Sequence, residues 1–194
     1  SEREIRRLTR EPDGAATYAA APGSHHVFHY LRLAAALGAT PELSPPVLAV
    51  AERDVTATRR KFKIEESGPP LVAINPGAEY GPAKRWPIES FVNAAARVQA
   101  EYPCRWVILG GGNDREMAGH LAAELGKRVS SPGSCAVTNV AGETTLRELC
   151  AILCASRLLL TNDTGPMHVA AALGRKTIAI FGPTEPTRTG PYGQ

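Results

Sequence analysis

From residue 70 to residue 182, short apolar runs alternate with longer stretches of helical character, and this alternation constrains the fold more than any other feature of the sequence. Strands that alternate with helices build a parallel sheet from βαβ units. We therefore expect an α/β fold, a Rossmann-like parallel sheet with helices on both faces. Gly126 and Gly174 are expected to end the helices that precede them. The expected strands are residues 71–75, 105–109, 137–140, 157–161 and 177–181, and the expected helices are residues 88–101, 114–125, 146–155 and 166–173.

Residues 1–69 lack this alternation. Apolar side chains at helical spacing predict a helix over residues 26–37 that stops at Gly38, and residues 51–65 are typical of a short charged helix. Glycines and prolines make residues 11–24 a predicted loop and residues 39–50 a predicted extended segment. The sequence thus predicts two parts that meet near residue 70.

Composition narrows the class of protein. Hydrophobic residues make up 43% of the chain and charged residues 21%, which is typical of a folded domain with a sizeable core. The net charge of +3 is too small, and the basic residues too scattered, to indicate a nucleic-acid partner. The four cysteines form no C-x-x-C pair, so we expect a reducing compartment and no zinc site. His25 and His29 have no carboxylate close to them in sequence, so we expect no metal site there. We expect no cofactor either.

Ligands of parallel sheets bind at the carboxyl ends of the strands, which directs attention to the loop at residues 161–168. Thr164 is placed to cap a helix whose first turn contains Pro166, and a helix start attracts phosphate. Thr164 and His168 are four residues apart, so both are expected to face one ligand. Asp163 would repel a diphosphate and is expected to accept hydrogen bonds from sugar hydroxyls or from loop N–H groups.

Two further loops follow expected strands. Residues 75–87 form a glycine-bearing loop with Lys84 and Arg85 just before a helix, where Lys84 is a candidate to neutralise a phosphate, although such a pair is often only solvated. Residues 110–116 are glycine-rich but lack the G-x-G-x-x-G pattern of a dinucleotide site. There Asp114 is either a ribose contact or a favourable acid in the first turn of a helix.

Two of these stretches resemble the signature motifs of the ADP-heptose:lipopolysaccharide heptosyltransferases. The first is residues 75–87 and the second is residues 162–174, and residues 180–191 continue the second motif. The resemblance implies a GT-B fold, in which two Rossmann-like domains face each other across a cleft. It implies that residues 70–194 are the donor domain, shortened at its C-terminal end. Residues 1–69 would be the remainder of an N-terminal acceptor domain and the linker between domains.

The resemblance also implies an activity. It is the inverting transfer of L-glycero-D-manno-heptose from ADP-heptose to the lipopolysaccharide inner core, with a lipid A–Kdo–heptose acceptor at the cytoplasmic face of the inner membrane. By the same resemblance Lys84 contacts the donor diphosphate. The residues Asp163, Thr164, Gly165 and His168 line the donor site, and Gly77, Asp114 and Thr144 are secondary contacts.

The family's acidic residue that resembles a catalytic base belongs to an opening glycine-rich segment, and residues 1–24 do not match that segment. No catalytic residue is therefore assigned, and we expect this chain to bind the donor without transferring heptose by itself. Two alternatives remain open at this point. One is a GT-B transferase with a different nucleotide sugar, and the other is a non-catalytic nucleotide-binding module. A nicotinamide-dependent oxidoreductase is disfavoured by the missing glycine pattern.

Overall fold

The computed structural model describes residues 24–40, 42–79, 81–129 and 137–192. The chain divides into two compact units, one of residues 1–46 with residues 184–194 and the other of residues 47–183. The larger unit contains the sheet and every site residue expected from the sequence. The boundary expected at residue 70 stays a prediction about the whole protein.

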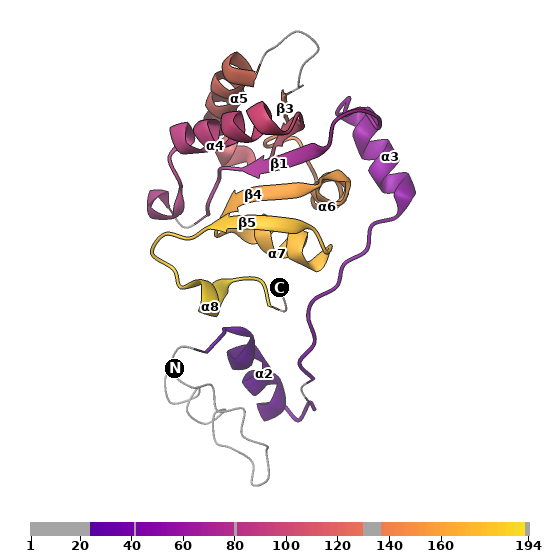
Figure 1. Cartoon of the computed structure of the whole chain (residues 1–194). Helices are drawn as coiled ribbons and strands as arrows, with labels where there is room; N and C mark the ends of the chain where they lie inside the picture. The colour runs from indigo at the N-terminus through magenta and orange to yellow at the C-terminus, as the bar shows by residue number, and fades with distance from the viewer. Residues whose placement is uncertain (1–23, 41, 80, 130–136, 193–194) are drawn as a thin grey trace. The chain divides into compact units, whose positions relative to one another are not determined.

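The larger unit is built on a five-stranded sheet in which all paired strands are parallel. Its order is β3-β2-β1-β4-β5, so β1 and β4 lie side by side in the centre (Figure 1). The expected α/β class is therefore confirmed. The strands are β1 (Leu71–Asn75), β2 (Arg105–Ile108), β3 (Val137–Asn139), β4 (Leu158–Asn162) and β5 (Lys176–Ile180).

Each face of the sheet has its own apolar core, because successive side chains of a strand point to opposite faces. Val72 and Ile74 of β1 pack with helices α4 (Ile88–Glu101) and α5 (Arg115–Val129). Leu71 and Ala73 of the same strand pack with helices α6 (Leu146–Ala155) and α7 (Gly165–Ala172). The inner strands β1 and β2 are buried along their whole length because both of their sides are covered, whereas the edge strands β3 and β5 are partly exposed.

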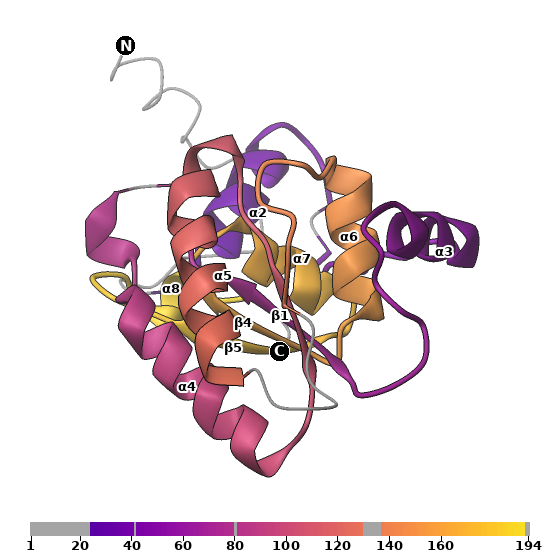
Figure 2. The same ribbon diagram turned by 90° about the horizontal axis from the view of Figure 1, so that it is seen from above.

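Helix α3 (Glu52–Lys61) packs on α6 rather than on the sheet (Figure 2). Two ion pairs join the helices, Arg147 to Asp54 at 3.0 Å and Lys61 to Glu148 at 2.7 Å. The hydrogen bond from Lys61 is the main reason why the pKa of the Glu148 carboxyl lies below its usual value. Glu148 also completes a capping box with Thr145, the residue before the first turn of α6.

One helix end predicted from the sequence is wrong. Gly126 does not end α5, which continues to Val129. Leu121, Leu125 and Val129 are all buried along one side of this helix, so packing against the sheet sustains the helix through the glycine. Gly174, by contrast, follows α7 with a φ of +66°, as a helix-ending glycine does.

The smaller unit contains α2 (Val27–Ala36) and α8 (Pro186–Thr189). Its two chain segments are joined at His25, whose Nε2 lies 2.8 Å from the carbonyl oxygen of Gly190. The His25 ring also stacks at a tilt on Tyr192. The predicted loop at residues 11–24 lies outside the described residues except for Ser24. Among the described residues no helix combines the length and the apolar character that a bilayer-spanning segment requires.

Candidate functional site

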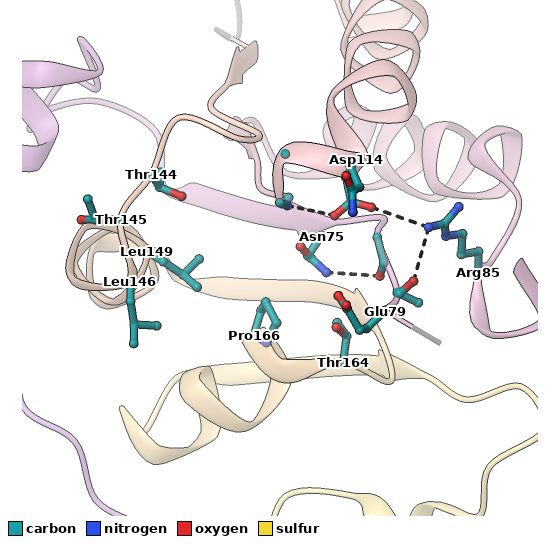
Figure 3. Close-up of a pocket in the computed structure, with 16 residues that line it drawn as sticks. Asn75, Glu79, Arg85, Asp114, Thr144, Thr145, Leu146, Leu149, Thr164 and Pro166 are labelled. Carbon is teal, nitrogen blue, oxygen red and sulfur yellow. Dashed lines mark hydrogen bonds and ion pairs between the residues drawn. The ribbon is translucent and has the colours of Figure 1, made fainter. Parts of the chain in front are cut away.

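The carboxyl ends of β1 and β4 border a cavity of about 440 Å³. In this sheet the chain leaves β1 toward β2 on one side, while β4 and β5 extend the sheet on the other side. Such a switch point separates the loops of neighbouring strands and is the usual binding crevice of an open α/β sheet. The lining residues are 75, 77–79 and 85 after β1, 110–114 after β2, 144–146 and 149 at the start of α6, and 164 and 166 at the start of α7 (Figure 3).

Asp114 forms a charged wall of this cavity. Its carboxylate accepts a hydrogen bond from the backbone N–H of Gly111 at 2.9 Å and lies 3.8 Å from the guanidinium of Arg85 (Figure 3). The carboxylate also occupies the space that a side chain at Gly77 would need, so a side chain there would displace the Asp114 carboxylate. Three expected or neighbouring site residues, Gly77, Arg85 and Asp114, are thus brought together.

The start of α6 supplies a more apolar wall. Thr144 precedes the helix, and the side chains of Leu146 and Leu149 face the same cavity (Figure 3). Thr145 caps the helix by accepting a hydrogen bond from the backbone N–H of Glu148. The cavity therefore offers apolar contacts at this side and polar groups at the other.

The start of α7 contributes less than the sequence suggested. Thr164 lies at the capping position but makes no side-chain capping bond, and it lines the cavity together with Pro166. Gly165 and His168 are exposed and do not line the cavity. Of the two side chains expected to face one ligand, the structure brings Thr164 to the cavity and leaves His168 outside its lining.

Lys84 and Asp163, expected separately as site residues, form a close ion pair. The Lys84 Nζ donates to Asp163 Oδ2 at 2.7 Å, and the two side chains are 17% and 6% exposed. Lys84 lies in the short helix η1 (Pro82–Lys84), and Asp163 follows β4 directly. The pair explains how a carboxylate is tolerated near a predicted phosphate site, because the lysine compensates its charge. Neither residue lines the cavity, whereas Arg85, next to Lys84, does.

The sequence interpretation missed Asn162, whose side chain is fully buried between β4 and the loop after β1. Its amide nitrogen donates to the carbonyl oxygen of Pro76 at 2.7 Å, and its amide oxygen accepts from the backbone N–H of Trp86 at 3.0 Å. Asn75 was also missed and lines the cavity. The available signal was a polar residue at the last position of each of two buried strands.

This arrangement is suited to an anionic, partly apolar ligand. The start of α7 lies at the positive end of the helix dipole, and Arg85 brings a cation to the cavity lining. Asp114 can accept hydrogen bonds from hydroxyl groups. Within the described residues no three His, Cys, Asp or Glu side chains are close enough together to hold a metal ion.

Comparison with known proteins gives similar relatives for most of the chain. The chain is 36% identical to lipopolysaccharide heptosyltransferase 2 of Escherichia coli K12 over 146 residues. This aligned region covers 75% of this chain and 40% of that protein. The structure of E. coli ADP-heptose lps heptosyltransferase II superposes with a TM-score of 0.68 at 35% identity, covering 80% of this chain and 45% of that one. A glycosyl transferase family 9 structure from Veillonella parvula gives a TM-score of 0.69 at 26% identity, covering 87% and 47%.

The chain thus spans about two fifths of the length of the curated relative it matches. One superposed structure is a heptosyltransferase and the other a glycosyl transferase of family 9, in keeping with the expected GT-B fold. Residues 13–194 match the model of glycosyltransferase family 9 (heptosyltransferase), which is most of the sequence. The chain therefore belongs to glycosyltransferase family 9, the heptosyltransferase family.

Proposed function

We propose that this chain is the donor-binding part of an inverting heptosyltransferase of lipopolysaccharide inner-core synthesis. The donor is ADP-heptose, and the sugar transferred is L-glycero-D-manno-heptose. The acceptor is a lipid A–Kdo–heptose molecule at the cytoplasmic face of the inner membrane. The observation that carries the proposal is the cavity at the carboxyl ends of β1 and β4, bordered by the two loops that resemble the family's motifs.

The features of the cavity support a nucleoside diphosphate sugar. A diphosphate near the start of α7 would meet the positive end of the helix dipole and the cations of Lys84 and Arg85. Asp114 supplies an acceptor for hydroxyl groups, and the leucines at the start of α6 supply apolar contact. The role of Lys84 in this proposal is to compensate phosphate charge while it remains anchored by Asp163.

Titration calorimetry of residues 1–194 with ADP-heptose, ADP and UDP tests the proposal. Lys84→Ala should weaken binding of both ADP ligands about tenfold or more, since a charge-assisted contact contributes about 1.5–3 kcal/mol. Lys127→Ala is the control, because that lysine is exposed, pairs with Glu124 within α5 and does not line the cavity. The double variant Lys84→Ala/Asp163→Asn separates binding from folding, because it leaves no unpaired carboxylate.

Tighter binding of UDP than of ADP would replace the proposed donor by another nucleotide sugar. Unchanged affinity in both variants that lack Lys84 would remove this lysine from the site. An unaltered, folded chain that binds none of the three ligands would contradict the proposal.

A further inference from the structure

We propose that Asn162 is a positioning residue that fixes the loop between β1 and α4, and with it Lys84 and Arg85, at the cavity. This inference rests on the proposed nucleotide-binding function and adds a residue to it. Asn162 does not line the cavity and acts through the loop that it holds.

The Asn162 side chain forms hydrogen bonds with the loop close to both of its ends. Its amide nitrogen bonds the carbonyl oxygen of Pro76, the first residue after β1, and its amide oxygen bonds the backbone N–H of Trp86, two residues before α4. Lys84 and Arg85 lie between these two points. A single side chain therefore determines where the basic part of the loop leaves the sheet and where it returns.

The chemistry of the side chain fits this task. A carboxamide donates through its nitrogen and accepts through its oxygen, so one planar group satisfies a carbonyl and an N–H together. Aspartate at this position would offer acceptors only and would face the Pro76 carbonyl with a negative charge. Because Asn162 is fully buried, removal of its side chain takes away the partner of the buried Pro76 carbonyl and of the Trp86 N–H, which costs stability and order of the loop.

Two neighbouring contacts fix the middle of the same loop. Asp163, the next residue along the chain, binds the Lys84 ammonium at 2.7 Å. Gly182, after β5, passes so close that a side chain there would meet the Ala83 carbonyl oxygen at 2.7 Å. The loop thus meets the end of β4 and the segments that follow β4 and β5. The Asn162 side chain makes three hydrogen bonds to it, because its amide nitrogen also lies 3.4 Å from the carbonyl oxygen of Gly77.

The test compares ADP with adenosine, because only ADP carries the phosphates that the loop cations would meet. Asn162→Ala should weaken ADP binding about tenfold by calorimetry and change adenosine binding, followed by ligand-observed NMR, by less than about twofold. In a Lys84→Ala background the same substitution should weaken ADP binding less than it does in the unaltered chain, since coupled residues are not additive, and the loss that remains is the part that acts through Arg85. Asn162→Ser, whose hydroxyl cannot bridge both partners, should give an intermediate loss.

Ser156→Ala is the matched control. Ser156 is equally buried, bonds the carbonyl oxygen of Ile152 at 2.8 Å, and lies before the amino end of the same strand. It should lose stability without loss of ADP affinity. If Asn162→Ala does not fold, the Asn162→Ser variant and its Lys84→Ala combination carry the test.

Three results would overturn the inference. One is ADP affinity unchanged in folded Asn162 variants, another is an equal loss for adenosine and ADP, and the third is full additivity with Lys84→Ala. ADP binding that depends on Lys84 but not on Asn162 would leave the proposed function standing. Absence of ADP binding to the unaltered chain would overturn both.

Discussion

The two ends of the sheet both contain buried polar side chains but use them differently. At the amino end Arg105 donates to the carbonyl oxygens of Glu65 and Pro69, and Ser156 donates to Ile152. These hydrogen bonds hold neighbouring chain segments at the starts of β2 and β4. None of the residues involved lines the cavity. At the carboxyl end Asn162 and Asp163 bind a loop that borders the cavity. A buried polar side chain therefore does not indicate a binding site by itself. Hydrogen bonds and ion pairs that join two loops beside a cavity are the more useful indication.

Removal of Arg105 is expected to have the largest effect of the predictions that test this comparison. Arg105→Ala deletes two charge-assisted hydrogen bonds from a nearly buried guanidinium, which should lower the free energy of unfolding by about 3 kcal/mol. Because Arg105 lies at the amino end, the affinity for ADP should not change in the folded variant. Urea unfolding and calorimetry measure the two quantities. Arg128→Ala, in the last turn of α5, is the control, and a loss of ADP affinity with Arg105→Ala would erase the distinction between the ends.

A methyl group at Gly182 should lower stability less than the loss of Arg105 does, but it should also lower the affinity for ADP. Its Cβ would lie 2.7 Å from the backbone oxygen of Ala83, so the loop that carries Lys84 must shift. We expect Gly182→Ala to lower stability by about 1–2 kcal/mol and to weaken ADP binding at the same time. Gly119→Ala in α5 is the matched control, since a Cβ there meets nothing within 4 Å. Unchanged ADP affinity with Gly182→Ala would mean that the carboxyl end tolerates loop movement.

The smallest expected effect concerns the acid dependence of the cavity wall at the start of α6. The hydrogen bond from Lys61, followed by those from Thr145, keeps the pKa of Glu148 below its usual value. A carboxyl with a lowered folded-state pKa stabilises the protein above its unfolded pKa of about 4.3, and this contribution is lost as the pH falls through the folded-state pKa. Glu148→Gln should remove about 0.5 kcal/mol near pH 7 and progressively less below pH of about 4.

Thermal unfolding between pH 3 and pH 7 measures this difference. Glu143→Gln, a nearby exposed carboxylate outside the capping box, is the control. An equal effect of Glu148→Gln at every pH would show that the ion pair and the capping box do not depend on the charge.

The sequence predicted the layers of the fold well because burial on both faces gives the inner strands mostly apolar runs. Residues 71–75, 88–101 and 146–155 have the same bounds in the sequence interpretation and in the structure. Gly126 was misjudged, because local propensity does not include the packing of α5 on the sheet. The loops that border the cavity were predicted from the rule that ligands bind where parallel strands end.

Individual roles within the site were harder to predict. Lys84 and Asp163 were each expected at the site, but their ion pair joins positions 79 residues apart, which no local pattern shows. Asn162 was not singled out, since its function depends on Pro76 and Trp86 lying together in space. His168 is exposed outside the cavity lining, and helical spacing alone does not give the direction in which a helix points its faces. The ligand contacts expected for these residues stay predictions.

The central position of β4 beside β1 has a consequence for the order in which the chain folds. β1, α4 and β2 are contiguous in sequence and can pair early, whereas the bond from Asn162 to Pro76 closes a separation of 86 residues. During synthesis from the N-terminus, β4 leaves the ribosome after all of these elements. The loop between β1 and α4 therefore acquires its fixed conformation late, and a partly synthesised chain with a formed β1–β2 pair has no assembled cavity.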